Sequence, residues 1–165
     1  MATKQAIKET NLSRAVIDLL INIPIFDALK SDELKVVSKY MNFMDFEPRE
    51  TVFKEGERGD YVCFITEGAL DVVKENDKGK QVIITSIGRG RSIGEMSVID
   101  DFPRSATVKA KTKTTLVILT RKGFEKVLDE HPGIGVKILK GISRLLSMNL
   151  RKTSSRLADY MLPLS

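Results

Sequence analysis

Residues on which catalytic and metal sites depend are scarce in this chain. Its 165 residues include one cysteine, one histidine and no tryptophan. A single cysteine excludes an internal disulfide and the cysteine-rich zinc sites, and the lone His131, beside a proline at a predicted helix end, is typical of a structural residue. The sequence offers no nucleophile paired with a base. We therefore expect no enzymatic activity, no catalytic residue, no bound metal and no cofactor.

Long hydrophobic runs are also missing. No apolar stretch approaches the roughly 20 residues that a membrane-spanning helix needs, and the first eleven residues lack the apolar core of a signal peptide. We therefore expect a cytoplasmic protein with no membrane partner. The composition, 42% hydrophobic and 30% charged, is typical of one globular domain over residues 1–165. The lone Cys63 lies in the apolar run YVCFIT, where a free cysteine packs as a small hydrophobe.

An excess of positive charge is confined to the C-terminal segment. Residues 132–165 hold six basic residues and one acidic residue, which accounts for the whole net charge of +5. A charge run of this size is more often the solvated face of a helix than a contact for an acidic partner. Nucleic-acid binding through this segment is therefore unfavoured, and we keep it only as a third alternative.

The first 50 residues are predicted to be helical. Apolar residues in the segment 13–26 recur at helical spacing until Pro24 stops the pattern. A second helix is expected to have Ser31 as its N-cap, two acidic residues in its first turn and one apolar face that extends to Met41.

From residue 51 the pattern changes to short β-rich runs separated by glycines. These runs recur at spacings near ten residues, and no long helical crossover lies between them. This arrangement favours an antiparallel roll over a sheet of βαβ units. The polar residues Asn76 to Gly79 are expected to form a hairpin tip between two strands. Residues 51–120 are therefore predicted to form a β-roll.

Residues 121–165 are predicted to be helical again. Thr120 is expected to cap a short helix that ends at Pro132, and one long helix follows. An apolar stripe runs along this long helix, with Leu139, Ile142, Leu146, Leu150, Thr153, Leu157 and Met161 three or four residues apart. The stripe would serve packing on the barrel or pairing with a second copy of the chain equally well.

The stretch GEMSVIDDFPRSAT, residues 94–107, contains the best candidate for a ligand site. Gly94 lets the backbone approach a ligand closely, and Glu95 offers a carboxylate to hydroxyl groups. Nine residues later, Arg104 supplies a planar cation suited to a phosphate, and Ser105 adds a hydroxyl and an amide. A ribose phosphate matches this pair of charges. The spacing alone is equally compatible with a Glu-Arg ion pair on a loop.

The longer stretch GEMSVIDDFPRSATVKA resembles the phosphate-binding cassette of the cyclic-nucleotide-binding domains, a family that includes catabolite activator protein and the regulatory subunits of protein kinase A. We call residues 94–107 the cassette. The resemblance extends over residues 18 to 160, with the helical start, the first barrel strands and the C-terminal helix in the family's order. It implies a mainly β fold with flanking helices: an antiparallel β-roll, or jelly-roll barrel, with N-terminal helices, a short cassette helix and a long C-terminal helix.

Carried over by position, the resemblance assigns a role to each cassette residue. Glu95 would accept the ribose 2′-hydroxyl, with backbone contacts from Gly94 and Met96. Arg104 would hold the cyclic phosphate, assisted by Ser105 and the Ala106 amide. In the family the C-terminal helix caps the purine, and the candidates on that helix are Asn149, Leu150 and Thr153.

The resemblance implies a binding protein, with cAMP favoured over cGMP as its ligand. The sequence ends at Ser165, which leaves no room for a winged helix-turn-helix, so we expect a stand-alone sensor that signals through its C-terminal helix to a partner. The alternative is a homodimeric interaction module with weak or lost nucleotide binding. The sequence does not identify the downstream effector or the oligomeric state.

Overall fold

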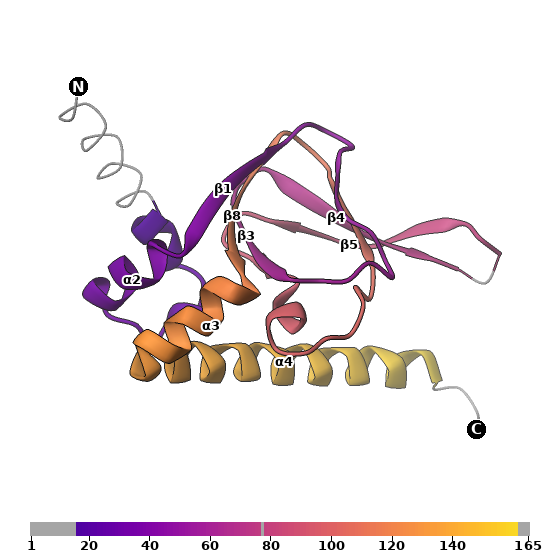
Figure 1. Cartoon of the computed structure of the whole chain (residues 1–165). Coiled ribbons are helices and arrows are strands. Elements are labelled where there is room, and N and C mark those ends of the chain that lie inside the picture. Colours follow the sequence, from indigo (N-terminus) through magenta and orange to yellow (C-terminus); the bar gives the residue numbers. More distant parts are fainter. Residues whose placement is uncertain (1–15, 77, 162–165) are drawn as a thin grey trace.

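The protein is built from two four-stranded antiparallel sheets that face each other as a roll (Figure 1). The computed structural model describes residues 16–76 and 78–161. The strand orders are β1-β8-β3-β6 in one sheet and β2-β7-β4-β5 in the other. The strands are β1 (Met41–Phe46), β2 (Thr51–Phe53), β3 (Tyr61–Glu67), β4 (Ala69–Glu75), β5 (Gln81–Gly88), β6 (Ser92–Ile93), β7 (Thr107–Ala110) and β8 (Thr114–Thr120). The predicted β-roll with flanking helices is thereby confirmed.

Helices flank the roll at both ends of the chain. Residues 16–20 are helical, and the further helical elements are η1 (Pro24–Phe26), α2 (Ser31–Ser38), η2 (Glu95–Val98), α3 (Arg121–Glu130) and α4 (Pro132–Met161). The Thr120 hydroxyl caps α3 as predicted, because it accepts a hydrogen bond from the Gly123 N–H at 3.0 Å. Within the described ranges, no helix combines the length and the hydropathy that crossing a bilayer requires.

The predicted boundary between the N-terminal helices and the roll was wrong. Residues 41–46 form strand β1 and pair with β8 along their whole length, so the roll begins ten residues earlier than predicted. Ladder pairing with β8 outweighs the weak helical pattern that had extended to Met41. Ser31 is the first residue of α2 and not its N-cap, which is Lys30, whose N–H donates to the Glu33 carboxylate at 2.8 Å.

Strands β3 and β8 separate two hydrophobic cores. Cys63 and Ile65 of β3 face the interior of the roll, whereas Val62 and Phe64 face the helices. A strand that is buried on both faces reads as an uninterrupted apolar run, which explains the sequence YVCFIT. Burial raises the pKa of the Cys63 thiol to about 12, so Cys63 is a packing residue.

The N-terminal half of α4 is docked on the rest of the protein. Ile134, Ile138 and Ile142 are buried in the core that lies beside the helices, and Figure 1 shows α4 passing beneath the roll. Gly141 makes the closest approach: a Cβ at this position would lie 2.0 Å from the Ile25 carbonyl oxygen of η1. The helix axis can therefore reach η1 only because residue 141 has no side chain.

We expect the Gly141→Ala substitution to destabilise the protein by about 1–3 kcal/mol, because the backbone of η1 cannot yield as a flexible side chain would. Gly133→Ala is the matched control, since no atom lies within 4 Å of its Cβ position. The control should raise the free energy of unfolding by at most about 1 kcal/mol, because alanine favours a helix more than glycine does and meets no neighbour here. Urea denaturation followed by circular dichroism measures both values, and equal effects of the two substitutions would contradict this account of how α4 is docked.

Candidate ligand-binding site

A pocket of about 700 Å³ lies between the cassette, strands β5 and β6, and helix α4. This volume is within the range of about 300–1,000 Å³ that is typical of small-molecule sites. The cassette residues that the sequence singled out all line it: Gly94, Glu95, Met96, Arg104, Ser105 and Ala106. The segments 94–96 and 104–106 are at least eight positions apart in the sequence. They therefore meet at one site.

Gly94 is required by the local backbone and by its neighbour. Its φ of 82° lies in the left-handed region, where a side chain is strained. A Cβ on Gly94 would lie 2.4 Å from Nη1 of Arg104, so any side chain would collide with the guanidinium. This glycine is the N-cap of η2 and leaves room for the arginine that follows ten residues later.

Arg104 is buried, with only 5% of its surface exposed, and its guanidinium already has partners within the protein. Nη1 donates to the Ser97 hydroxyl at 2.8 Å, and Nη2 donates to the Tyr61 carbonyl at 2.9 Å. The guanidinium also lies 4.0 Å from the centre of the Phe53 ring and 4.6 Å from that of Tyr61, which are favourable cation–π distances. The sequence did not predict this inward anchoring.

One donor of Arg104 is left over. Its Nε is buried and has no hydrogen-bond partner in the described part of the chain. The atom lies against Gly59, where a Cβ would come within 2.8 Å of Nε and 2.1 Å of the Ser97 hydroxyl oxygen. A buried donor without an acceptor is unfavourable by about 1–3 kcal/mol, so an anion that reaches this arginine gains an unsatisfied partner.

Glu95 is the second buried charge of the pocket, with 9% of its surface exposed. Burial raises the pKa of the Glu95 carboxyl, although its own backbone amide and the nearby Arg104 act in the opposite direction. A carboxylate that is removed from water in this way gains from any hydroxyl that donates to it. Glu95 is therefore prepared to accept a hydrogen bond from a ligand.

Two backbone amides of the cassette are free to bind an anion. In the ranges that the structure describes, neither the Ser105 N–H nor the Ala106 N–H donates a hydrogen bond. The residue before them is fixed, since the Arg104 N–H donates to the Glu57 carbonyl at 2.8 Å and the Arg104 carbonyl accepts from Gly56 at 2.9 Å. Two consecutive amides on a fixed segment form a suitable seat for a phosphate.

Helix α4 forms the opposite wall of the pocket. Of the three residues expected to cap a base, Asn149 and Thr153 line the pocket, and Leu150 does not. Each step along an α-helix turns the side chain by about 100°, so Leu150 points away from the face that Asn149 and Thr153 share. Leu150 is 68% exposed and lies on the side of α4 that faces away from the pocket.

The sequence reasoning missed several residues of the site. Lys152 and Arg156 line the pocket on the same helical face as Asn149, a spacing of three and four residues that could have identified them. Arg121, the first residue of α3, donates to the Ser97 carbonyl at 2.6 Å and contacts the Asp101 carboxylate. No sequence signal marks Arg121, because its acceptors are mainly backbone carbonyls of the cassette.

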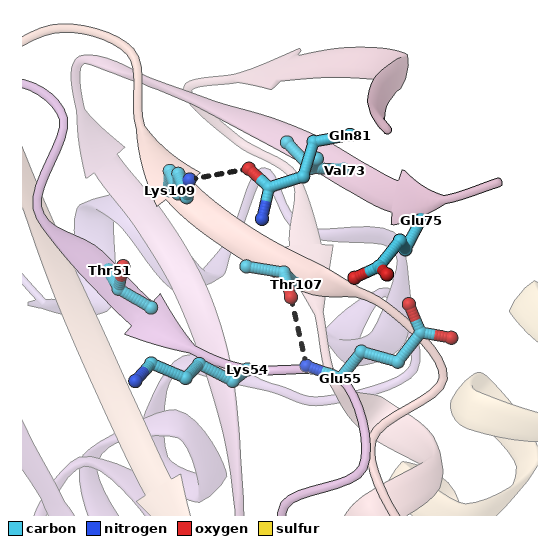
Figure 2. A pocket seen from close by; sticks show the side chains of 8 residues that line it. All are labelled: Thr51, Lys54, Glu55, Val73, Glu75, Gln81, Thr107 and Lys109. Carbon is cyan, nitrogen blue, oxygen red and sulfur yellow. Dashed lines mark hydrogen bonds between the residues drawn. The ribbon is translucent and has the colours of Figure 1, made fainter. Parts of the chain in front are cut away.

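A second depression, of about 380 Å³, lies on the face of the β2-β7-β4-β5 sheet opposite its core (Figure 2). Two pairs of its polar groups are hydrogen-bonded to each other. Lys109 Nζ donates to the Gln81 side chain at 2.8 Å, and the Glu55 N–H donates to the Thr107 hydroxyl at 3.0 Å. Figure 2 shows the Lys109 side chain reaching Gln81, which lies on β5 beyond the intervening strand β4, and Glu55 beside Thr107 of β7. None of the predicted site residues contributes to this depression.

Comparison with known proteins identifies the family. The profile of the cyclic nucleotide-binding domain matches residues 43–131, more than half of the chain. The chain is 28% identical over 144 residues to a CRP-like cAMP-activated global transcriptional regulator of Mycobacterium tuberculosis, covering 87% of this chain and 62% of that protein. It is 32% identical over 120 residues to a cAMP-dependent protein kinase regulatory subunit of Yarrowia lipolytica, covering 72% of this chain and 31% of that protein.

The comparison of folds also identifies the cyclic nucleotide-binding domain. The crystal structure of a cyclic nucleotide-binding domain from Methylobacillus flagellatus superposes with a TM-score of 0.81 at 28% identity, covering 92% of this chain and 85% of that one. The chain spans less than two thirds of the length of both curated relatives. The shared part contains the roll and the cassette, and the chain therefore belongs to the cyclic nucleotide-binding domain family.

Proposed function

We propose that this chain is a regulatory sensor that binds cAMP in the pocket between the cassette and α4 and catalyses no reaction. The observation that best supports this proposal is the lining of one pocket. It contains a buried carboxylate, Glu95, a buried cation, Arg104, and the two free amides of Ser105 and Ala106. In this proposal the amides and Arg104 bind the cyclic phosphate, and Glu95 accepts the ribose 2′-hydroxyl. The base then lies toward Asn149 and Thr153.

The preference for cAMP rests on the relatives and on the chemistry of the cassette. The names of the two relatives described above include cAMP, one as cAMP-activated and one as cAMP-dependent. Ser105 adds a hydroxyl beside the phosphate seat, which is compatible with either purine. Because adenine and guanine differ only in their polar edges, the choice between them depends on the partners that Asn149 and Thr153 offer.

Isothermal titration calorimetry with cAMP, cGMP and linear 5′-AMP tests the proposal. We expect saturable heat with cAMP, weaker binding of cGMP, and binding of 5′-AMP weaker than that of cAMP by about tenfold or more, because its dianionic, freely rotating phosphate does not match a fixed two-amide seat. Absence of heat with both cyclic nucleotides would refute the sensor. Tighter binding of cGMP than of cAMP would keep the sensor and correct its ligand.

The signal would pass through α4. The N-terminal half of this helix is anchored by Ile134, Ile138 and Ile142, whereas side chains from residue 147 onward are exposed within the described range. A ligand that contacts Asn149 and Thr153 interacts with the half that has few protein contacts of its own. Such a ligand can shift the equilibrium between two placements of that half, and a partner protein reads the difference.

A homodimeric interaction module remains the second candidate, and one observation favours it. Three apolar side chains on the side of α4 away from the pocket are exposed: Leu150 is 68% exposed, Leu157 57% and Met161 67%. Residues 150 and 157 are seven positions apart, the spacing of a coiled-coil seam. Light scattering at several cAMP concentrations separates the candidates, because a dimer that forms without ligand and shows no heat of binding supports the module alone.

A further inference from the structure

We infer that the pocket contains a second anion subsite at its α4 end, so that its preferred ligand carries two phosphate groups separated by a nucleoside. The inference rests on the proposed function, because it takes the cassette as the first phosphate seat. Three cations of the pocket lining carry it: Arg91, just before β6, and Lys152 and Arg156 on α4.

These three cations have no counter-charge in the described part of the chain. Six basic residues of the described part of the chain form ion pairs, among them Lys137 with Glu33 at 2.6 Å and Lys74 with Glu55 at 3.3 Å. No carboxylate of the described residues lies within ion-pair distance of Arg91, Lys152 or Arg156. The positive charge at this end of the pocket is therefore available to a ligand.

The charges of the pocket do not match a ligand with one phosphate. Its lining includes four cations but only two carboxylates, Glu95 and Asp100. A cyclic mononucleotide carries one negative charge, which in the proposed pose lies against Arg104 and the Ser105 amide. That pose directs an uncharged purine toward α4, where Lys152 and Arg156 would remain without a partner. A second phosphate on the far side of the nucleoside supplies the missing charge, and an arginine side chain binds phosphate oxygens in pairs.

Helical geometry supports this assignment. Residues 149, 152, 153 and 156 fall within an arc of about 100° around the axis of α4, so they share one face, and all four line the pocket. Arg151 and Lys140 lie on the same helix but do not line the pocket. Lys152 and Arg156 thus lie on the same face of α4 as Asn149, the face that lines the pocket.

The test compares two double variants that remove the same charge. Lys152→Gln with Arg156→Gln removes the proposed subsite, and Lys140→Gln with Arg151→Gln is the control on the other faces of α4. All four residues are exposed, so both variants should fold, and circular dichroism tests this expectation. The probes are cAMP, cyclic diadenylate, cyclic diguanylate and the linear dinucleotide pApA, which distinguishes a cyclic from a linear source of the second phosphate.

We expect at least one dinucleotide to bind the parent protein more tightly than cAMP does, and the Lys152/Arg156 variant to lose about tenfold of that affinity. The same variant should lose much less of its affinity for cAMP than of its affinity for the dinucleotide, and the control should change neither affinity by more than about twofold. The dinucleotide affinity should also fall more steeply with added salt than the cAMP affinity.

The outcomes separate this inference from the proposed function. If cAMP binds and no dinucleotide binds more tightly, the second subsite is refuted and the cAMP sensor stands. Equal losses in the two double variants would also refute the subsite, because the effect would then be one of net charge. Binding of a dinucleotide without binding of cAMP would support the subsite and refute cAMP as the ligand. If no probe binds, both proposals fail.

Discussion

Arg104→Ala should remove cyclic nucleotide binding and lower the stability of the protein at the same time. Truncating one partner of a buried charge pair weakens binding by about 2–5 kcal/mol, which corresponds to roughly 30-fold or more in affinity. The stability effect has a separate origin, because the Ser97 hydroxyl and the Tyr61 carbonyl lose their charged donor. We expect a loss of about 1–3 kcal/mol in the free energy of unfolding from these groups.

The control for this prediction is Ser97→Ala. This substitution removes one partner of the Arg104 guanidinium, at 2.8 Å, and leaves the arginine in place. Stability should fall by about 1 kcal/mol while most of the affinity for cAMP remains. Calorimetry and urea denaturation on the parent, Arg104→Ala and Ser97→Ala measure both quantities. A folded Arg104→Ala protein that bound cAMP as tightly as the parent would show that this arginine only supports the cassette.

The cassette was predictable because its chemistry is local in sequence. Residues 94–96 and 104–106 lie within one short stretch, which made them a candidate site, and the resemblance to a known family favoured a ligand site over the Glu-Arg ion pair that the spacing left equally open. The structure brings these six residues to one pocket. The long C-terminal helix was equally predictable, since its apolar stripe keeps helical spacing over α4 (Pro132–Met161).

What could not be predicted depends on contacts between distant segments. The burial of Arg104 depends on Phe53, Tyr61 and Gly59, which come from the other end of the roll's sequence. Strand β1 exists because β8, more than 70 residues later, supplies its ladder partners. Such pairings override local patterns, and local patterns are all that a single sequence displays.

Leu150 shows the same limit of prediction from sequence within a single helix. The sequence placed Asn149, Leu150 and Thr153 together as candidates to cap a base, but Leu150 is turned by about 100° from Asn149 to the side of the helix away from the pocket. The same periodicity includes Lys152 and Arg156, which the charge count had assigned to a solvated face. The sequence shows which residues of α4 share a face. Which of these faces points toward the ligand is known only once the packing of α4 on the roll is known.

Glu95→Gln should weaken the binding of cAMP and stabilise the free protein at neutral pH. A hydroxyl that donates to a carboxylate is worth about 1.5–3 kcal/mol, and one that donates to a neutral amide about 0.5–1.5 kcal/mol, so the affinity for cAMP should fall by about tenfold. The control ligand is 2′-deoxy-cAMP, which lacks the donor. The parent should discriminate strongly against this ligand and the Glu95→Gln variant only weakly, and equal discrimination by both would contradict the assignment of Glu95 to the 2′-hydroxyl.

The stability gain follows from the sign of the pKa shift. Burial raises the pKa of Glu95 above its usual 4.5, so the folded protein holds this proton more tightly than the unfolded chain does. The resulting stability is present below about pH 4.5 and is lost as the pH rises through the higher pKa of the folded state. Because glutamine does not titrate, the variant should match the parent at low pH and exceed it increasingly toward pH 7. In the proposed pose cAMP donates to the charged form of Glu95, so bound cAMP should narrow the difference in stability between the two proteins.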